Sequence, residues 1–185
     1  EGVPAEAVPA ALAKRGLSIT APLGFNNTYA LGTTKESARK LGLSKLSDLA
    51  AREHVRLGFS TEFMERKDGW PGLRQRYGFV ASDVRGLDHD LAYRALAAGE
   101  LDAIDLYATD AEIRLYDLVI LDDDAAYFPR YEALLVFRED LEARAPEVVR
   151  ALRRLEGAID ADAMRTMNAE VKVEHKSEQL VATEF

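Results

Sequence analysis

The sequence predicts an α/β fold in which helices cover a sheet. Segments with helical periodicity alternate with short apolar runs typical of strands as far as about Phe137, and only helical segments follow. The chain contains no internal repeat, no low-complexity segment and no Gly/Ser-rich linker; the one soft boundary lies at 122–129, which is polar and then aromatic. With 185 residues, the chain can form one large domain or two small ones.

The first expected element is an Ala-rich helix at 7–15, which Gly16 ends as a left-handed cap. A strand is expected at 17–22. The sequence Gly-Phe-Asn-Asn-Thr-Tyr at 24–29 favours a sharp turn, because Gly and Asn tolerate left-handed backbone. This turn leads into an extended segment at 29–32. Small ligands usually bind at strand ends of this kind in open α/β sheets.

Two helices are expected before the next strand. The first, at 33–41, opens with a capping box in which Thr33 is the N-cap and Glu36 lies three residues further on. The second covers 44–52 and carries leucines on one side. Apolar and other residues then alternate at 55–59, which predicts a strand.

A charged, loop-like stretch follows at 60–69. We expect Asp68 to cap the next helix, which ends near Tyr77. The only tryptophan, Trp70, is expected to pack beneath the start of that helix rather than to contact a ligand. A short strand is predicted at 83–87.

The remaining elements follow the same reasoning. A helix at 90–98 carries an apolar stripe and is closed by Gly99. The others are, in order, a strand at 101–107, one or two helical turns at 111–116, strands at 118–121 and 132–137, and helices at 146–155, 160–173 and 175–185.

Composition excludes several classes of function. A net charge of −8 argues against a nucleic-acid partner, which favours a concentrated basic surface. Cysteine is absent, so disulfides and thiol chemistry are excluded. The three histidines, His54, His89 and His175, show no ligand spacing and are expected on the surface. The acidic run at 122–124 predicts a solvated loop rather than a metal site, and we expect no cofactor.

Membrane and targeting signals are also missing from the sequence. No segment approaches the roughly 20 apolar residues that a membrane span needs. The first five residues lack the basic and apolar blocks of a signal peptide.

Enzymatic activity is not expected. Two carboxylates such as Glu62 and Asp105 could serve acid–base catalysis, but nothing in their spacing forces them together. We find no nucleophile motif, no phosphate-binding glycine loop and no metal dyad.

Four motifs occur in order along the chain: GFNNTYAL at 24–31, FMERKDG at 63–69, IDLYATD at 104–110 and YFPRY at 127–131. Together they resemble the substrate-binding proteins of bacterial compatible-solute importers, the glycine betaine/choline/carnitine binding family of ABC transporters. The resemblance extends from about Ala10 to the C-terminus.

The resemblance implies a two-lobed fold of the type II periplasmic-binding class. The inserted lobe would be 27–128, and the flanks 1–26 and 129–185 would be the remnant of the other lobe. That first lobe is incomplete, because the long N-terminal portion that normally builds most of it is absent. The chain thus resembles the C-terminal two-thirds of a family member.

The resemblance also implies a binding site for a methylated ammonium with a carboxylate. Aromatic faces attract such a cation by about 0.5–2 kcal/mol per ring, and arginine binds a carboxylate with two parallel hydrogen bonds. Asn26, Asn27 and Thr28 would touch the ligand or, by the interpretation we favour, only shape the turn. The cage rings would be Tyr29, Tyr107 and Tyr131, and the carboxylate would be held by Arg66.

The expected function is therefore capture of glycine betaine, choline, carnitine or a similar quaternary amine, followed by delivery to a membrane permease. The alternative is a ligand-sensing domain of a regulator with the same fold class. We expect a periplasmic or extracytoplasmic location, with a possible membrane anchor at an N-terminus outside this sequence. Uncovered apolar surface on the incomplete lobe predicts self-association.

Overall fold

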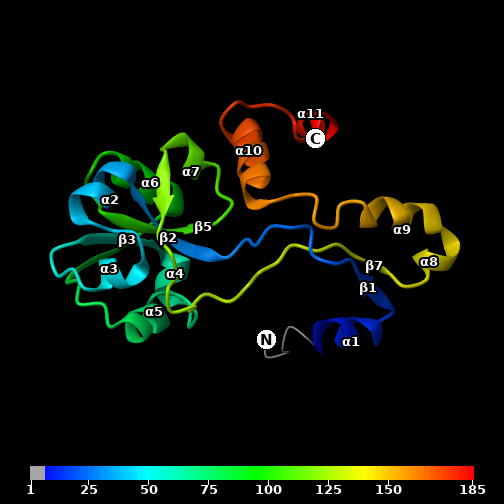
Figure 1. The fold of residues 1–185 in the computed structure, drawn as a ribbon, viewed down its shortest axis with the longest axis horizontal. Coiled ribbons are helices and arrows are strands. Elements are labelled where there is room, and N and C mark those ends of the chain that lie inside the picture. The colour runs from blue at the N-terminus through cyan, green and yellow to red at the C-terminus, as the bar shows by residue number, and fades with distance from the viewer. Residues whose placement is uncertain (1–6) are drawn as a thin grey trace. The chain divides into compact units, whose positions relative to one another are not determined.

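The computed structural model describes residues 7–185, and these residues form two compact units (Figure 1). Unit 1 contains the described residues up to Asn26 together with Tyr131–Met164. Unit 2 contains Asn27–Arg130 together with Arg165–Phe185. The chain therefore crosses between the units after Asn26, after Arg130 and after Met164. Which of these residues form each lobe of the intact protein stays a prediction.

Unit 2 is built on a mixed five-stranded sheet. The order across the sheet is β4-β3-β5-β2-β6, with β3 parallel to both β4 and β5. By contrast, β2 runs antiparallel to its neighbours β5 and β6. The strands are β2 (Tyr29–Thr34), β3 (Arg56–Ser60), β4 (Asp83–Leu87), β5 (Ala103–Tyr107) and β6 (Leu118–Ile120).

Helices cover both faces of this sheet (Figure 1). Successive side chains of a strand point to opposite faces, so Leu31 joins one apolar cluster and its neighbour Ala30 joins the other. Full burial of a Leu or Phe side chain in such a cluster contributes roughly 1.5–3 kcal/mol. The cluster with Leu31 packs on α3 (Leu46–Ala50), α4 (Thr61–Glu65) and α5 (Trp70–Tyr77), and that with Ala30 on α6 (His89–Ala97) and α7 (Glu112–Leu115). The predicted α/β fold is confirmed.

The C-terminal part of unit 2 packs against the loop after β5. Arg165 Nε donates to the carbonyl oxygen of Ala108 at 2.8 Å, and Asn168 Nδ2 donates to that of Thr109 at 2.8 Å. Lys172 forms ion pairs with Glu112 and Asp90. Arg165, Asn168 and Lys172 all belong to α10 (Ala161–Lys172), and the last helix of the chain, α11 (Glu178–Glu184), follows it.

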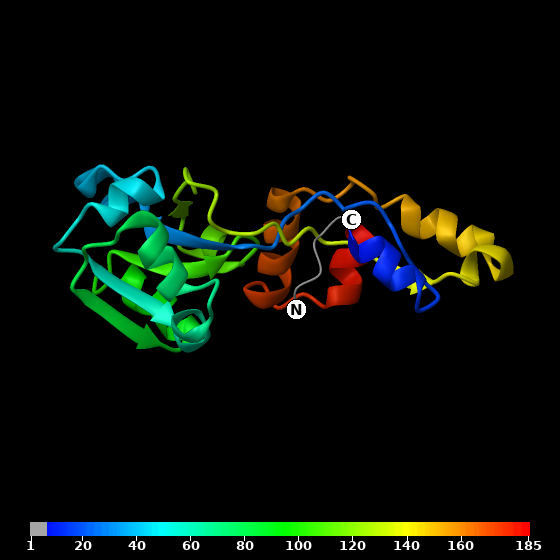
Figure 2. The ribbon, with the colours of Figure 1, turned by 90° about the horizontal axis from the view of Figure 1, so that it is seen from below.

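Unit 1 contains a two-stranded antiparallel sheet. Strand β1 (Leu17–Ile19) pairs with β7 (Val136–Arg138), and the backbone pairing continues past the strands as far as an isolated bridge between Asn26 and Glu132. The two segments lie side by side in both views (Figures 1 and 2). The helices of unit 1 are α1 (Val8–Ala13), α8 (Leu141–Arg144) and α9 (Pro146–Arg153).

Local signals in the sequence mark most element ends correctly, with several corrections. The stretch at 60–69, expected to be loop-like, contains the helix α4, which Ser60 caps. The strand expected at 17–22 ends at Ile19. The helix α2 (Lys35–Leu41) is capped by Thr34, whose hydroxyl accepts from Ser37 N, and not by Thr33. Gly69 precedes α5 at the N-cap position without a side-chain cap, so the expected cap by Asp68 is wrong. The strand expected at 132–137 is reduced to β7, because most of that segment pairs only intermittently with 17–26.

Candidate functional site

Tyr29 and Tyr107 meet at one end of the unit 2 sheet. Tyr29 begins β2 and Tyr107 ends β5, and the antiparallel register places them directly opposite each other. Their ring centroids lie 4.8 Å apart with an interplanar angle of 31°, and their hydroxyl oxygens lie 3.0 Å apart. Sheet register therefore brings together two residues that are 78 positions apart in sequence.

Two phenylalanines extend this pair into an aromatic cluster. The ring of Phe63 lies 5.1 Å from that of Tyr29, and the ring of Phe128 lies 6.2 Å from that of Phe63. Tyr29 is only 5% exposed, whereas Tyr107 is half-buried. Burial, followed by the hydrogen bond with Tyr107, raises the pKa of the Tyr29 phenol above its ordinary value. Tyr29 is therefore a neutral ring at every physiological pH.

Arg66 lies over this cluster. Its Cζ atom is 5.8 Å from the ring centroid of Tyr29, within the range of a cation–π contact. Its Nε and Nη2 donate to the two carboxylate oxygens of Asp68 at 2.8 and 2.7 Å, and Nη1 lies 3.5 Å from Glu62 Oε1. The guanidinium thus sits between an aromatic face and two carboxylates. The structure brings Tyr29, Tyr107 and Arg66 together within unit 2.

A buried carboxylate fixes the helix that carries Phe63 and leads to Arg66. Asp105 is fully buried on β5 and accepts hydrogen bonds from Ser60 N and Ser60 Oγ, both at 2.6 Å. Ser60 Oγ in turn accepts from Phe63 N and caps α4. Burial raises the pKa of Asp105. Because Asp105 bonds to Ser60, the structure gives no support to a catalytic pair with Glu62.

A second carboxylate, Asp110, holds the end of β5. Its Oδ2 accepts from Tyr107 N at 2.8 Å and from Tyr93 Oη at 2.7 Å, and lies 3.1 Å from His89 Nε2. Burial alone would raise the pKa of Asp110, but these hydrogen bonds outweigh it and hold the pKa below its ordinary value. The same contact raises the pKa of His89, against an opposing effect of burial.

The expectation that His89 lies on the surface is therefore wrong. Its ring is half-buried and its centroid lies 5.5 Å from that of Tyr107, at 52°. His54 and His175 are exposed, as expected. No local signal in the sequence marks His89, because its partners Asp110 and Tyr107 come from β5 and the loop after it.

The acidic run at 122–124 lies in a loop with Asp122 and Asp124 exposed, as expected, whereas Asp123 is half-buried and bonded. Asp123 accepts hydrogen bonds from Tyr77 Oη, from Tyr127 N and, at 2.8 Å, from Phe128 N. The carboxylate thereby positions Phe128 beside Phe63. Asp124 accepts from Ser47 Oγ at 2.7 Å. Among the described residues, no group of three or more histidine or acidic side chains could hold a metal ion.

The other predicted site residues lie at the crossings between units. In unit 2, Asn27 Oδ1 accepts from Thr109 Oγ1 at 2.6 Å, and Thr28 Oγ1 donates to the carbonyl oxygen of Pro129 at 2.8 Å. In unit 1, Asn26 Oδ1 accepts from Tyr131 N at 2.6 Å, and Tyr131 is 43% exposed. The bonds of Thr28 and Asn26 link the first crossing segment to the second, and that of Asn27 links it to the loop after β5.

Trp70 packs where the sequence predicts. It lies at the start of α5 and is 6% exposed. The centroid of its ring lies 4.9 Å from that of Phe59 and 5.1 Å from that of Phe79. It is therefore a core residue of unit 2.

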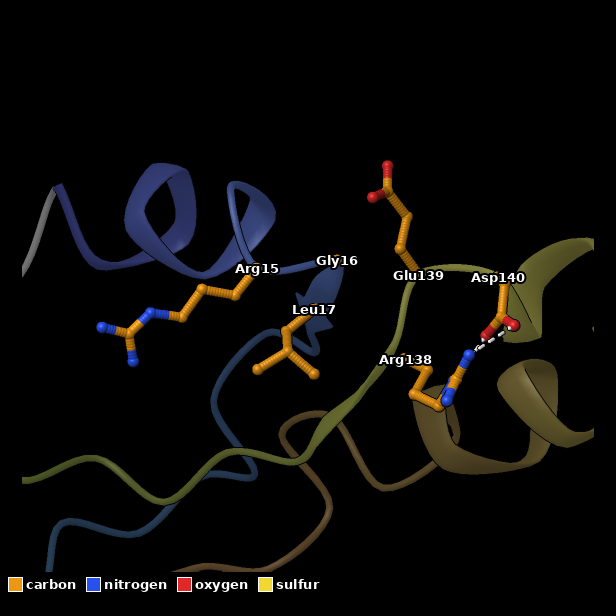
Figure 3. Close-up of a pocket in the computed structure, with 6 residues that line it drawn as sticks. All are labelled: Arg15, Gly16, Leu17, Arg138, Glu139 and Asp140. Atoms are coloured by element: carbon orange, nitrogen blue, oxygen red, sulfur yellow. Dashed lines mark hydrogen bonds and ion pairs between the residues drawn. The ribbon is translucent and has the colours of Figure 1, made fainter.

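Unit 1 contains a separate surface cavity of about 530 Å³ at the end of the small sheet (Figure 3). Its lining is charged rather than aromatic, and the Arg138 guanidinium donates to both oxygens of Asp140 at 3.0 and 2.9 Å. A quaternary ammonium would find no aromatic face there. The lining residues are Arg15, Gly16, Leu17, Arg138, Glu139 and Asp140.

Comparison with known proteins identifies relatives along nearly the whole chain. The sequence model described as the substrate binding domain of ABC-type glycine betaine transport systems matches residues 2–185. The chain is 36% identical over 164 residues to the ergothioneine transport permease/ergothioneine binding protein EgtU of Helicobacter pylori, covering 88% of this chain and 30% of that protein. It is 34% identical over 184 residues to the glycine-betaine-binding protein of Pseudomonas aeruginosa, covering 92% of this chain and 59% of that protein.

A solved structure shows the same fold. The crystal structure of a glycine betaine/carnitine/choline ABC transporter protein superposes with a TM-score of 0.89 at 36% identity, covering 99% of this chain and 69% of that one. The chain spans between about a third and three fifths of the length of the two curated relatives. In residues 7–185 we find no helix whose length and hydropathy would let it cross a bilayer.

Proposed function

The chain belongs to the family of substrate binding domains of ABC-type glycine betaine transport systems, and on that premise we propose that it is the solute-binding component of an ABC importer. Its fold is that of the type II periplasmic binding proteins. The family consists of binding domains and not of enzymes. The proposed solute is a compatible solute with a quaternary ammonium, such as glycine betaine, choline or carnitine.

The observation that carries this proposal is the paired rings of Tyr29 and Tyr107 beneath a guanidinium. A quaternary ammonium cannot donate strong hydrogen bonds, so a site must recognise its charge and bulk. Aromatic faces recognise both the charge and the bulk of such a group. Each cation–π contact contributes about 0.5–2 kcal/mol, depending on desolvation. The contact of Arg66 with Tyr29 supports the view that this cluster accepts a cation.

Each predicted residue keeps a role in the proposal. Tyr29 and Tyr107 supply rings, Arg66 binds the carboxylate of the solute, and a third ring from Tyr131 stays a prediction of the family resemblance. Asn26, Asn27 and Thr28 position the crossing segments, a role that their bonds to Tyr131, Thr109 and Pro129 support.

The names of the relatives support the ligand class. One is named for ergothioneine and another for glycine betaine. Both compounds combine a trimethylammonium group with a carboxylate. We therefore propose a methylated amino-acid zwitterion as the solute class.

The proposal includes delivery of the solute to a membrane permease. It places the protein in the periplasm or otherwise outside the cytoplasm, held at the membrane by an N-terminal anchor. Self-association through the incomplete lobe is a further prediction, which light scattering tests: a monodisperse monomer would contradict it.

The proposed function is tested by calorimetric titration of the full-length protein with glycine betaine and with its carbon isostere, in which a tert-butyl group replaces the trimethylammonium and the carboxylate is kept. Cation–π recognition predicts that glycine betaine binds at least fivefold more tightly, since about 1 kcal/mol or more is lost with the positive charge. Equal affinity for the two compounds would contradict a cation site. The isostere is a matched control, because size and shape are retained.

A further inference from the structure

We propose that Arg66 is a resident cation that occupies the ring of Tyr29 until a carboxylate-bearing solute displaces it. The inference rests on the proposed function and adds a rule of selectivity to it. A solute carboxylate exchanges with Asp68 as the partner of the guanidinium, and the ring becomes available to the ammonium of the same solute.

The first step in the argument is the position of the guanidinium. Its Cζ atom lies 5.8 Å from the centroid of Tyr29, where a methylated ammonium would have to sit to use that face. The other neighbours of the ring are Tyr107 at 4.8 Å and Phe63 at 5.1 Å. Tyr29 is 5% exposed, so a solute reaches its face only if a neighbour moves.

The second step is that Arg66 is the neighbour able to move. Phe63 is fully buried and fixed through the hydrogen bond from its N–H to Ser60. The ring of Tyr107 is held by the contact of its hydroxyl with that of Tyr29 at 3.0 Å. Arg66 comes directly after the last residue of α4, and its side chain is 41% exposed.

The third step concerns the partners of the guanidinium. Asp68 occupies Nε and Nη2 in the two-bond geometry that a solute carboxylate would use. A carboxylate on the solute can therefore replace Asp68 without leaving the guanidinium unpaired. A solute without a carboxylate offers no such exchange and must compete with Arg66 for Tyr29.

The selectivity that follows is for zwitterions over simple cations. Glycine betaine brings a carboxylate that can pair with Arg66 in place of Asp68, whereas choline brings none and leaves Arg66 on Asp68 over the ring. Arg66 in this account disfavours choline and favours glycine betaine, so its removal should change the two affinities in opposite directions.

The test is calorimetric titration of Arg66→Gln with both solutes, using the full-length protein. We expect choline to bind about two- to fivefold more tightly than in the wild type, as one competing cation–π contact is removed. Glycine betaine should bind about tenfold more weakly, because a two-bond charged contact is lost. Arg66→Lys keeps the positive charge but loses the two parallel donors of the guanidinium. This variant should bind glycine betaine more weakly and should not bind choline more tightly than the wild type does.

Arg85→Gln is the matched control. Arg85 also donates through Nε and Nη2 to an aspartate two residues away, Asp83, at 2.9 and 2.8 Å. Within residues 7–185, however, the structure shows a cation–π contact for Arg66 and none for Arg85. Its replacement should leave both affinities unchanged. Thermal unfolding of each variant shows whether the fold is retained.

The outcomes separate this inference from the proposed function. Arg66→Gln that weakens glycine betaine and leaves choline unchanged makes Arg66 a simple carboxylate clamp and overturns the inference alone. Equal weakening of both solutes also overturns it. A wild-type protein that binds neither solute overturns the proposed function as well.

Discussion

The hydroxyl oxygens of Tyr29 and Tyr107 lie 3.0 Å apart at directly opposed positions of two antiparallel strands. Their rings form the base of the proposed site, and the hydroxyl contact fixes how the rings face each other. Ring and hydroxyl therefore have separable roles.

Tyr107→Phe tests that separation. The variant keeps the ring and removes the hydroxyl bond to Tyr29, so the free energy of unfolding should fall by about 1 kcal/mol. Affinity for glycine betaine should stay within about threefold of the wild type, because the cation contacts the ring face. Urea denaturation and calorimetry measure the two effects. Complete loss of binding would show that the hydroxyl contacts the solute.

His89→Gln tests the contact with Asp110 through pH. The raised pKa of His89 means that its contribution to stability is complete below its ordinary pKa of 6.5 and is lost as pH rises through the raised value. The lowered pKa of Asp110 means that its contribution is complete above its ordinary pKa of 3.8 and is lost as pH falls through the lowered value. The stability difference from wild type should therefore be largest between these two ordinary values.

Within that window, we expect a difference in the free energy of unfolding of about 1.5–3 kcal/mol, as for a hydrogen bond to a charged group. Urea denaturation from acid to mildly alkaline pH measures it, with exposed His54→Gln as the control. A difference that does not change with pH would contradict the ion pair.

Asp123→Ala tests the turn that positions Phe128. The substitution removes the acceptor of Tyr77 Oη, Tyr127 N and Phe128 N, so we expect a loss of about 2–3 kcal/mol in the free energy of unfolding. Asp122 is exposed and directly precedes it, which makes Asp122→Ala the control. Chemical denaturation measures both variants, and equal stabilities would contradict the role of Asp123.

Gly69→Ala tests the loop that carries Arg66 and Asp68. A Cβ atom at Gly69 would overlap the carbonyl oxygen of Phe63, a backbone atom that cannot rotate away. We expect a loss of about 1–3 kcal/mol in stability by overpacking together with weaker glycine betaine binding. Gly86→Ala, where the added Cβ would meet only Met64 Cγ at 3.9 Å, is the control. Identical thermal unfolding of the two variants would contradict the close approach.

Local patterns in the sequence predict much of the fold. Alternating apolar residues predict β3 near its true position, and Gly42 ends α2 with a left-handed backbone, as expected after a helix of this kind. The sequence misplaces the cap of α2 by one residue, because Glu36 lies three residues after Thr33 and so favours Thr33 over the adjacent Thr34. Only the structure shows Thr33 Oγ1 donating to the carbonyl oxygen of Asp102 instead.

Long-range pairing is where the sequence carries less information. No local sequence pattern shows that β2 lies between β5 and β6 in the sheet. This strand order places Tyr29 opposite Tyr107. The resemblance to a family grouped Tyr29, Tyr107 and Arg66, and the structure places these three together in unit 2. The positioning roles of His89, Asp110 and Asp123 were missed, because each depends on partners that folding brings from other elements.

The most direct test of the proposed site is calorimetric titration of glycine betaine into the full-length protein. Three forms are compared: the wild type, Tyr107→Ala and Tyr116→Ala. Tyr116 also lies in unit 2, but the aromatic ring beside it is that of Tyr93, at 6.2 Å, so its variant controls for loss of a tyrosine. We predict affinity at least tenfold lower for Tyr107→Ala and unchanged for Tyr116→Ala. Unchanged affinity in Tyr107→Ala, with the fold retained, would contradict a cation site at this end of the sheet.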